Sequence, residues 1–236
     1  QEIVENWLPR YTGENLENFG KYILLTNFSN YVTMFAEWNK VPVIGLGRPM
    51  QCATADDITI INFGMGSPTA ATVMDLLTAI EPKAVLFLGK CGGLKKRNKL
   101  GDLILPIAAI RGEGTSNDYL PAEVPALPAF ALQKAVYTTN RRVWEHDEVF
   151  KEYLQKVRAY AIDMETATIF TVGFYNKIPT GALLLVSDQP MIPEGVKTEE
   201  SDKSVTAQYV EKHLHIGIDS LKQLINDGLT VRHLKF

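Results

Sequence analysis

Short, almost uninterrupted apolar and β-branched runs recur along this chain, and stretches with helical periodicity separate them. Uninterrupted apolar runs are typical of strands that are covered on both faces of a sheet. The alternation therefore predicts an α/β fold, with three layers (α/β/α) around a central, mainly parallel mixed sheet. The expected strands are 22–26, 58–63, 84–88, 102–110, 136–139, 158–162 and 182–187, and the expected helices are 29–38, 68–80, 166–175 and 201–224.

Nothing in the sequence divides the chain into parts. It has 236 residues, 46% of them hydrophobic, which is enough to bury one sizeable core. Residues 1–236 are expected to form a single domain, because no internal repeat, low-complexity tract or linker interrupts them. The proline-rich segment 121–128 is expected to be a surface connection that leads into a helix.

Charge and hydropathy exclude several kinds of partner. The net charge is −3, and no basic tract is present apart from a cluster at 95–99, which argues against a nucleic-acid partner. No stretch approaches the roughly 20 apolar residues of a membrane span. The N-terminal segment is acidic and amphipathic rather than signal-like, so we expect a cytoplasmic protein without a membrane partner.

Cysteine and histidine usage predicts no metal. The two cysteines, Cys52 and Cys91, are too few for a disulfide framework or a four-cysteine zinc site, which also favours a reducing compartment. Of the four histidines, His213 and His215 are two positions apart and point to different sides of a helix. We expect the histidines to be solvated helix residues.

Acidic residues stand at the ends of two expected strands. The apolar run 181–187 ends in Asp188, and Asp163 to Glu165 follow the run 158–162. For Asp188 alone, a turn residue before Pro190 is the simpler interpretation. The alternative is that both strand ends deliver carboxylates into one apolar wall, which is how α/β proteins usually build a polar reaction centre.

Glycine-rich turns follow other strands. Gly64 and Gly66 come after the run 58–63, with Ser67 suited to the helix N-cap. Small residues here let backbone amides and the helix dipole face an anion, although a turn that only needs conformational freedom is the alternative. A dinucleotide fingerprint would have a third glycine at Thr69, so no NAD and no other cofactor is expected.

A second glycine turn and an arginine extend this pattern. Cys91 and Gly92 belong to the turn after the run 84–88, and Arg111 follows a third strand. Arg111 could neutralise a phosphate through a bidentate contact, or form a surface ion pair with Glu113 or Asp118.

In this order the motifs resemble the nucleoside phosphorylase superfamily over nearly the whole chain. The segments 62–68, 88–94, 136–139, 163–169 and 215–219 are closest to the AMP nucleosidases of that superfamily. The resemblance implies a nucleoside-phosphorylase-like catalytic domain that hydrolyses the N-glycosidic bond of AMP to adenine and ribose 5-phosphate. Purine nucleoside phosphorylase or nucleosidase activity on unphosphorylated nucleosides is the alternative, and a nucleotide sensor without catalysis is a further one.

The resemblance also implies roles for single residues. Met164 and Glu165 would hold the ribose, with an ionised Glu165 carboxylate on its hydroxyls. Asp188 would be the acid at purine N7, since protonation of the leaving adenine lowers the barrier. An aspartic acid donates near neutral pH only where burial or negative charge raises its pKa. The turns at 64–66 and 91–92, and Arg111, would lie beside the polar groups of the substrate.

Departures from the family are informative. Phosphorylases of this superfamily carry an arginine that grips the attacking phosphate, and here Tyr31 stands in its place, which makes water the expected acceptor. Arg48 is a candidate for a phosphate contact across a subunit boundary. Lys90 either binds the 5′-phosphate or caps its turn. Arg142, in the segment 140–144, either offers its charge to the substrate or belongs to a helix N-terminus.

The remaining implications concern chain length and assembly. The family has additional residues between Ala135 and Val136, so a mobile loop is expected to be missing there. The resemblance implies a homo-oligomer, a hexamer, that binds AMP, with phosphate as a ligand or effector. It implies no nucleic-acid partner.

Overall fold

The computed structural model describes residues 1–122 and 135–228. Within them a 9-stranded sheet has the strand order β2-β3-β1-β4-β8-β7-β6, with β9 beside β4 and β5 beside β9. The strands are β1 (Tyr22–Thr26), β2 (Cys52–Ala55), β3 (Ile58–Asn62), β4 (Ala84–Gly93), β5 (Leu103–Ile104), β6 (Ala108–Gly112), β7 (Ala135–Thr139), β8 (Ala161–Asp163) and β9 (Thr180–Asp188). The helices are α1 (Glu2–Thr12), α2 (Ser29–Asn39), α3 (Ser67–Leu76), α4 (Glu148–Lys156), α5 (Thr166–Tyr175) and α6 (Glu199–Asp227), and short 3-10 turns are η1 (Leu16–Asn18), η2 (Leu77–Ala79), η3 (Thr115–Asp118) and η4 (Pro193–Gly195).

The sheet is mixed and mainly parallel, as the sequence predicts. β1 is parallel to β3 and β4, β4 to β9, and β7 to β6 and β8. β2 and β5 are antiparallel to their neighbours, and β8 meets β4 in antiparallel fashion at Gly92 and Gly93. The carboxyl ends of β1, β7, β8 and β9 therefore gather around the far end of β4.

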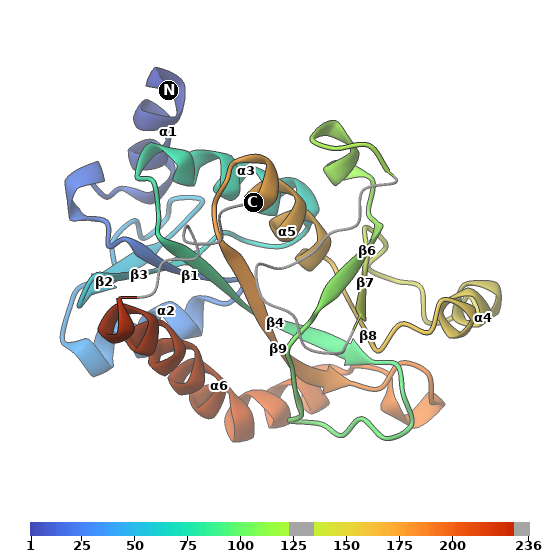
Figure 1. The fold of residues 1–236 in the computed structure, drawn as a ribbon. Coiled ribbons are helices and arrows are strands. Elements are labelled where there is room, and N and C mark those ends of the chain that lie inside the picture. The colour runs from blue at the N-terminus through green and yellow to red at the C-terminus, as the bar shows by residue number, and fades with distance from the viewer. Residues whose placement is uncertain (123–134, 229–236) are drawn as a thin grey trace.

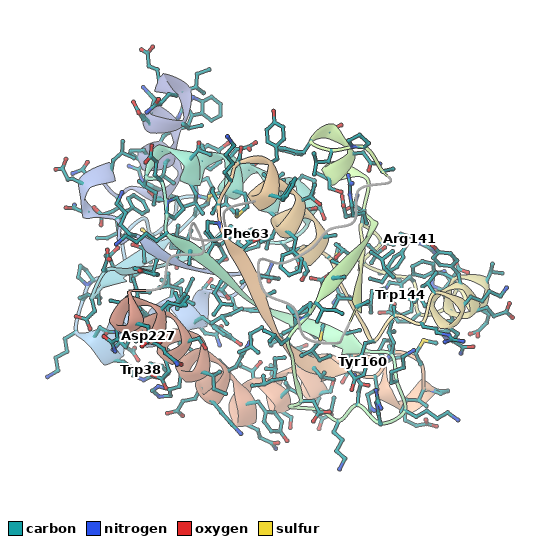
Figure 2. The ribbon with its side chains drawn as sticks, viewed as in Figure 1. Trp38, Phe63, Arg141, Trp144, Tyr160 and Asp227 are labelled. Carbon is teal, nitrogen blue, oxygen red and sulfur yellow. The ribbon has the colours of Figure 1, made fainter. Side chains whose placement is uncertain are left out.

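Helices cover both faces of the sheet, so the three-layer prediction is confirmed. Figure 1 shows α1, α3 and α5 on one side and α2 and α6 on the other. Alternate residues of β1 serve the two sides: Ile23 and Leu25 pack in the cluster with α3 and α5, and Leu24 packs in the cluster with α2 and α6. Phe63, 1% exposed, belongs to the first cluster (Figure 2).

Several expected elements differ from the observed ones. Residues 89–93 are not a turn: β4 continues through them, because Gly92 and Gly93 pair with β8. The run 102–110 forms two strands, β5 and β6, which pair with different neighbours. The strand β2 and the helices α1 and α4 lie outside the expected elements. The helix expected after 128 falls outside the described residues.

Two local features near the pocket also differ from expectation. The N-cap of α3 is Gly66, at φ 93°, and not Ser67. Ser67 is instead the first helical residue, and its hydroxyl donates to the carbonyl oxygen of Met164 at 2.7 Å. A left-handed φ favours glycine at position 66, since a Cβ is strained there. None of the described helices is long and apolar enough to cross a bilayer.

Candidate active site

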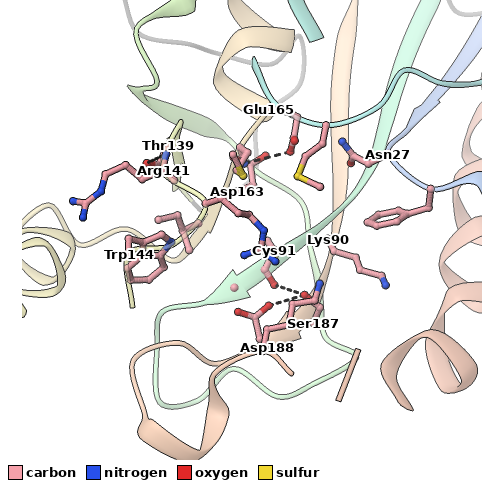
Figure 3. Close-up of a pocket in the computed structure, with 17 residues that line it drawn as sticks. Asn27, Lys90, Cys91, Thr139, Arg141, Trp144, Asp163, Glu165, Ser187 and Asp188 are labelled. Atoms are coloured by element: carbon pink, nitrogen blue, oxygen red, sulfur yellow. Dashed lines mark hydrogen bonds between the residues drawn. The ribbon is translucent and has the colours of Figure 1, made fainter. Parts of the chain in front are cut away.

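A pocket lies where strand ends meet around the last residues of β4 (Figure 3). It is lined by Asn27, Phe28, Met65, Lys90, Cys91, Gly92, Thr139, Arg141, Arg142, Trp144, Ile162, Asp163, Met164, Glu165, Ser187, Asp188 and Lys197. Of the residues predicted from the sequence, Asp188, Glu165, Met164, Cys91, Gly92 and Arg142 are brought together here. Carboxyl ends of parallel strands are where α/β sheets commonly bind ligands.

Asp188 is the last residue of β9, and it lines the pocket rather than starting a turn on the surface. The register between β4 and β9 shifts between Cys91 and Gly92, so that Cys91 pairs with Val186 and Gly92 with Asp188. Ser187 is therefore the extra residue of a β-bulge, a device that re-aims side chains at sheet ends. A Cβ on Gly92 would lie 3.1 Å from Asp188 Oδ2. The glycine keeps that space open.

Burial raises the pKa of the Asp188 carboxyl. Ser187 Oγ donates to Asp188 Oδ1 at 2.6 Å, and the positive charges of Lys197 and Arg142 act with this bond to lower the pKa, but burial outweighs them. A raised pKa is what an aspartic acid needs in order to hold a proton for donation.

Glu165, 4% exposed, is held by backbone amides. The Gly66 N–H donates to its Oε1 at 2.8 Å, and the Met164 N–H donates to its Oε2 at 3.3 Å. The anion facing the N-terminus of α3 is thus a carboxyl of this chain. Gly64 and Gly66 were expected to face substrate, but neither lines the pocket, because this contact occupies the Gly66 amide and the Gly64 carbonyl accepts from Asn27.

Asp163 is a second buried carboxyl, separated from Glu165 by Met164. Its Oδ1 accepts from Thr138 Oγ1 at 2.7 Å, and its Oδ2 accepts from the backbone N–H of Thr166 at 2.8 Å and from the Thr166 hydroxyl. These donors act to lower the pKa of Asp163, but burial outweighs them and the pKa is raised. Burial, and after it the negative charge of Asp163, raises the pKa of Glu165 to about 8. The raised pKa favours the protonated form of Glu165 in the pocket by itself, whereas the sequence analysis expects the ionised form.

Cationic side chains line the same pocket. Lys90 Nζ lies 2.9 Å from Asp202 Oδ1 and 2.8 Å from Thr206 Oγ1, and Lys197 Nζ lies 2.9 Å from the same Asp202 oxygen. Lys90 also lies 4.6 Å from the centre of the Phe28 ring. Its side chain is 6% exposed, and burial lowers its pKa. Lys90 therefore faces the pocket and α6, and does not cap a turn.

Arg141 and Arg142 come from the connection between β7 and α4. Arg141 Nη1 lies 2.8 Å from Asp147 Oδ2, whereas Arg142 forms no salt bridge within residues 1–122 and 135–228. Segment 140–144 is not a helix N-terminus, because α4 begins at Glu148 with Asp147 as its N-cap. Trp144 both packs against Phe150 and lines the pocket.

Two predicted arginines lie outside the pocket. Arg111 donates to Ser116 Oγ at 2.7 Å and to the carbonyl oxygens of Leu120 and Pro121, so it organises the loop that follows β6. Glu113, one of the two suggested ion-pair partners, accepts from the backbone N–H and the hydroxyl of Ser116.

Arg48 is also outside the pocket of its own chain. It donates to the carbonyl oxygen of Arg10 at 2.8 Å and lies against Gly13.

Tyr31 belongs to a buried chain of hydrogen bonds. Its hydroxyl lies 2.8 Å from Nδ1 of His213, and Nε2 of His213 lies 2.8 Å from the Leu183 carbonyl oxygen. A carbonyl only accepts, so Nε2 carries the proton and Nδ1 accepts from Tyr31. His213 is 0% exposed, and burial lowers its pKa to about 4. The prediction that the histidines are solvated helix residues is therefore wrong for His213. It holds for His215, which is exposed and stacks on Trp38.

Sequence reasoning missed part of the lining. Asn27 follows β1 and Thr139 ends β7, so the ends of the predicted strands would have indicated them. Lys197 lies in the connection before α6, and no local pattern marks it. In the part of the chain that the structure describes, no three His, Cys, Asp or Glu residues are grouped to hold a metal ion.

Comparison with known proteins places this geometry in a family. The family model of the Phosphorylase superfamily matches residues 21–222. The chain belongs to the phosphorylase superfamily.

Individual members of the phosphorylase superfamily are similar to different degrees. AMP nucleosidase of Escherichia coli K12 is 28% identical, and the match covers 94% of this chain and 58% of that protein. This chain thus spans less than two thirds of that relative. A crystal structure of AMP nucleosidase from Bacteroides thetaiotaomicron is 54% identical with a TM-score of 0.84, covering 96% of this chain and 98% of that one. Purine nucleoside phosphorylase from Toxoplasma gondii, 18% identical with a TM-score of 0.75, shares the fold; the match covers 91% of this chain and 95% of that one.

Proposed function

We propose that this protein hydrolyses the N-glycosidic bond of AMP to adenine and ribose 5-phosphate. The observation that carries the proposal is one pocket that holds a buried Glu165 and a partly buried Asp188, both with raised pKa, together with several cations. Figure 3 shows Glu165 and Asp188 at opposite ends of that pocket, with Cys91 between them. The similarity to proteins named AMP nucleosidase supports the same activity.

The two carboxyls have different roles in the proposed reaction. Protonated Asp188 donates its proton to N7 of adenine while the C1′–N9 bond breaks, so the base leaves neutral. The sugar gains oxocarbenium character, water adds to C1′ and loses a proton to solvent, and Asp188 takes up a proton from solvent for the next cycle. Glu165, with Met164 beside it, receives the ribose hydroxyls. Hydroxyl donors favour the ionised carboxylate, so bound substrate lowers the pKa of Glu165 and the resulting negative charge stabilises the developing cation.

The cations favour a nucleotide over a nucleoside. Lys90, Lys197, Arg141 and Arg142 line the pocket, and the raised pKa values of Glu165 and Asp188 reduce the opposing negative charge near neutral pH. Arg142 lies near Asp188 and has no salt-bridge partner among the described residues. A phosphate monoester suits such a set of donors, and an arginine can bind it through two hydrogen bonds.

Water is the proposed acceptor. At the position where phosphorylases have a phosphate-binding arginine, Tyr31 donates to a neutral, buried His213. This pair supplies no positive charge for an attacking phosphate. Inorganic phosphate remains a proposed ligand or effector.

Assembly, compartment and chain organisation are further proposals. We propose a homo-oligomer, a hexamer; exposed apolar side chains on α1 (Ile3 and Trp7) and at the end of α5 (Phe174 and Tyr175) support it. In such an assembly Arg48 would contact a phosphate bound in the pocket of a neighbouring subunit. A cytoplasmic location is supported by the free cysteines Cys52 and Cys91.

We also propose that the chain forms one catalytic domain that lacks a loop between Ala135 and Val136. These two residues are consecutive in β7. The alignment with the Escherichia coli relative covers 283 positions, more than the 236 residues of this chain, so that relative has residues absent here.

The test is a product assay on AMP in phosphate-free buffer, with chromatographic detection of adenine and ribose 5-phosphate. Equal concentrations of adenosine, with and without added phosphate, serve as controls. We expect release of adenine from AMP without phosphate. Cleavage of adenosine alone, or only with phosphate present, would contradict the proposal and favour a nucleosidase or phosphorylase acting on unphosphorylated nucleosides. Binding of AMP without turnover would indicate a sensor.

A further inference from the structure

A second cavity adjoins the pocket at Asp188. Its volume is about 220 Å³, and Ser187 and Asp188 line both spaces. The other walls come from Leu100 and from the segment that joins β9 to α6, including Ile192 and Val196. The proposed hydrolysis of AMP leaves this cavity without a role.

The wall formed by the segment after β9 is an ordered loop. The Gln189 N–H donates to the Gly195 carbonyl at 2.8 Å, the Ile192 N–H donates to the Gln189 carbonyl at 3.1 Å, and the Gly195 N–H donates to the Ile192 carbonyl at 3.0 Å. A Cβ on Gly195 would lie 2.8 Å from Cβ of Gln189, so glycine lets the loop close on itself. The Gln189 side chain also donates to the carbonyl oxygen of Asn98.

The chemistry of adenine connects this cavity to the substrate. On the edge of adenine that carries N7, the neighbouring group is the exocyclic 6-amino group, so the edge presents an acceptor beside a donor. A protonated Asp188 matches the acceptor on this edge, because its O–H donates to N7. The amino nitrogen then lies at the boundary between the pocket and the second cavity.

The second cavity is lined partly by apolar side chains and partly by polar ones, including Glu194 and Ser201. Leu100 and Ile192 are each 41% exposed. An unsubstituted amine buries no apolar surface against Leu100 and Ile192. An alkyl or aryl group on the amine would cover these two side chains, and the apolar surface removed from water would favour binding. A cavity of about 150 Å³ is known to accept benzene, so this one is large enough for a benzyl group.

We propose that the second cavity receives an apolar substituent on the 6-amino nitrogen, so that the substrates include N6-alkyl and N6-aralkyl derivatives of adenosine 5′-phosphate. This inference rests on the proposed function, because it uses the placement of adenine N7 at Asp188. The reaction at C1′ is unchanged, and the substituted adenine leaves in place of adenine.

The experiment compares kcat/KM for N6-benzyl-AMP and AMP. We expect the two values to agree within about tenfold, whereas a closed wall at this edge would lower the value for the benzyl compound by more than about a hundredfold. Ile192→Trp fills the mouth of the cavity and should reduce kcat/KM for N6-benzyl-AMP at least about tenfold, with AMP turnover retained. Leu105→Trp is the matched control, because Leu105 is 44% exposed and does not line the cavity.

Two results would overturn the inference: N6-benzyl-AMP that is neither cleaved nor inhibitory while AMP is cleaved, or a benzyl preference that Ile192→Trp and Leu105→Trp affect equally. Binding of the free bases separates this inference from the proposed function. Calorimetry with N6-benzyladenine and adenine needs no turnover, so it tests the cavity even if AMP is not cleaved. We expect N6-benzyladenine to bind at least as tightly as adenine, and binding more than about tenfold weaker would refute the cavity assignment.

Discussion

The backbone N–H of Gly66 donates a 2.8 Å hydrogen bond to Oε1 of Glu165, a residue 99 positions later in the chain. The bond joins the N-terminus of α3 to the loop between β8 and α5. It holds one carboxyl of the pocket in a fixed orientation before any ligand is present. An amide at a helix N-terminus also favours negative charge, so it assists ionisation of Glu165 when substrate hydroxyls arrive.

The ionisation of Glu165 predicts a pH-dependent stability. The ordinary pKa of a glutamic acid side chain is 4.5, and the pKa of Glu165 in the folded protein is about 8. The folded pKa is the higher one, so the favourable contribution of the protonated group is complete below pH 4.5 and is lost as the pH rises to about 8. Glu165→Gln lacks this titration. The free energy of unfolding of the variant should therefore increase relative to the natural protein between these pH values, as measured by urea denaturation; a constant difference would contradict the raised pKa.

Asp188→Asn should lower kcat on AMP by about 10²–10⁴-fold, because an amide has no acidic proton for the leaving adenine. The fold should survive, since Asn is isosteric and can still accept from Ser187. Kinetics on AMP at fixed pH, with circular dichroism to check folding, provide the measurement. Near-normal turnover in the variant would remove Asp188 from its role as the acid.

Arg142→Met should raise KM for AMP about tenfold or more and affect any cleavage of adenosine less, because adenosine lacks the 5′-phosphate that the lost charge would contact. Lys222→Met is the control for charge: Lys222 lies 3.7 Å from Asp56 on the surface and does not line the pocket. An equal effect of Arg142→Met on both substrates would assign Arg142 to the base or ribose instead.

Tyr31→Phe should destabilise the fold by about 1–3 kcal/mol, because it leaves the buried Nδ1 of His213 without a donor. Turnover on AMP should change little, since Tyr31 does not line the pocket. Chemical denaturation and steady-state kinetics on one preparation separate the two effects. A large loss of kcat with unchanged stability would mean that Tyr31 takes part in the reaction.

The ends of the strands were predictable from the sequence, and so was the placement of acidic residues at those ends beside one another. Glu165 and Asp188 follow apolar runs, and parallel strands bring such residues to one edge whatever the intervening loops do. Whether the Arg111 side chain lines the pocket was not predictable in this way. The direction of its side chain depends on how the loop after β6 folds back, which hydrophobic periodicity does not encode.

His213 shows a different limit. Helical periodicity places it on α6, but its burial depends on α2 and β9, which supply Tyr31 and the Leu183 carbonyl from distant parts of the sequence. Lys90 was ambiguous for a similar reason, because its partner Asp202 lies 112 positions away. Such long-range polar pairs need the three-dimensional arrangement of the elements.

The bulge at Ser187 means that the position of the acid depends on the number of residues in β9 as well as on their identity. The extra residue lets Asp188 pair with Gly92 and also places the Ser187 hydroxyl against Asp188 Oδ1. Deletion of Ser187 would leave Asp188 opposite Gly92 in an even register, but it would remove this hydrogen bond and the local re-aiming of the strand that the bulge provides. A single insertion in an ordinary strand is thus sufficient to place a proton donor.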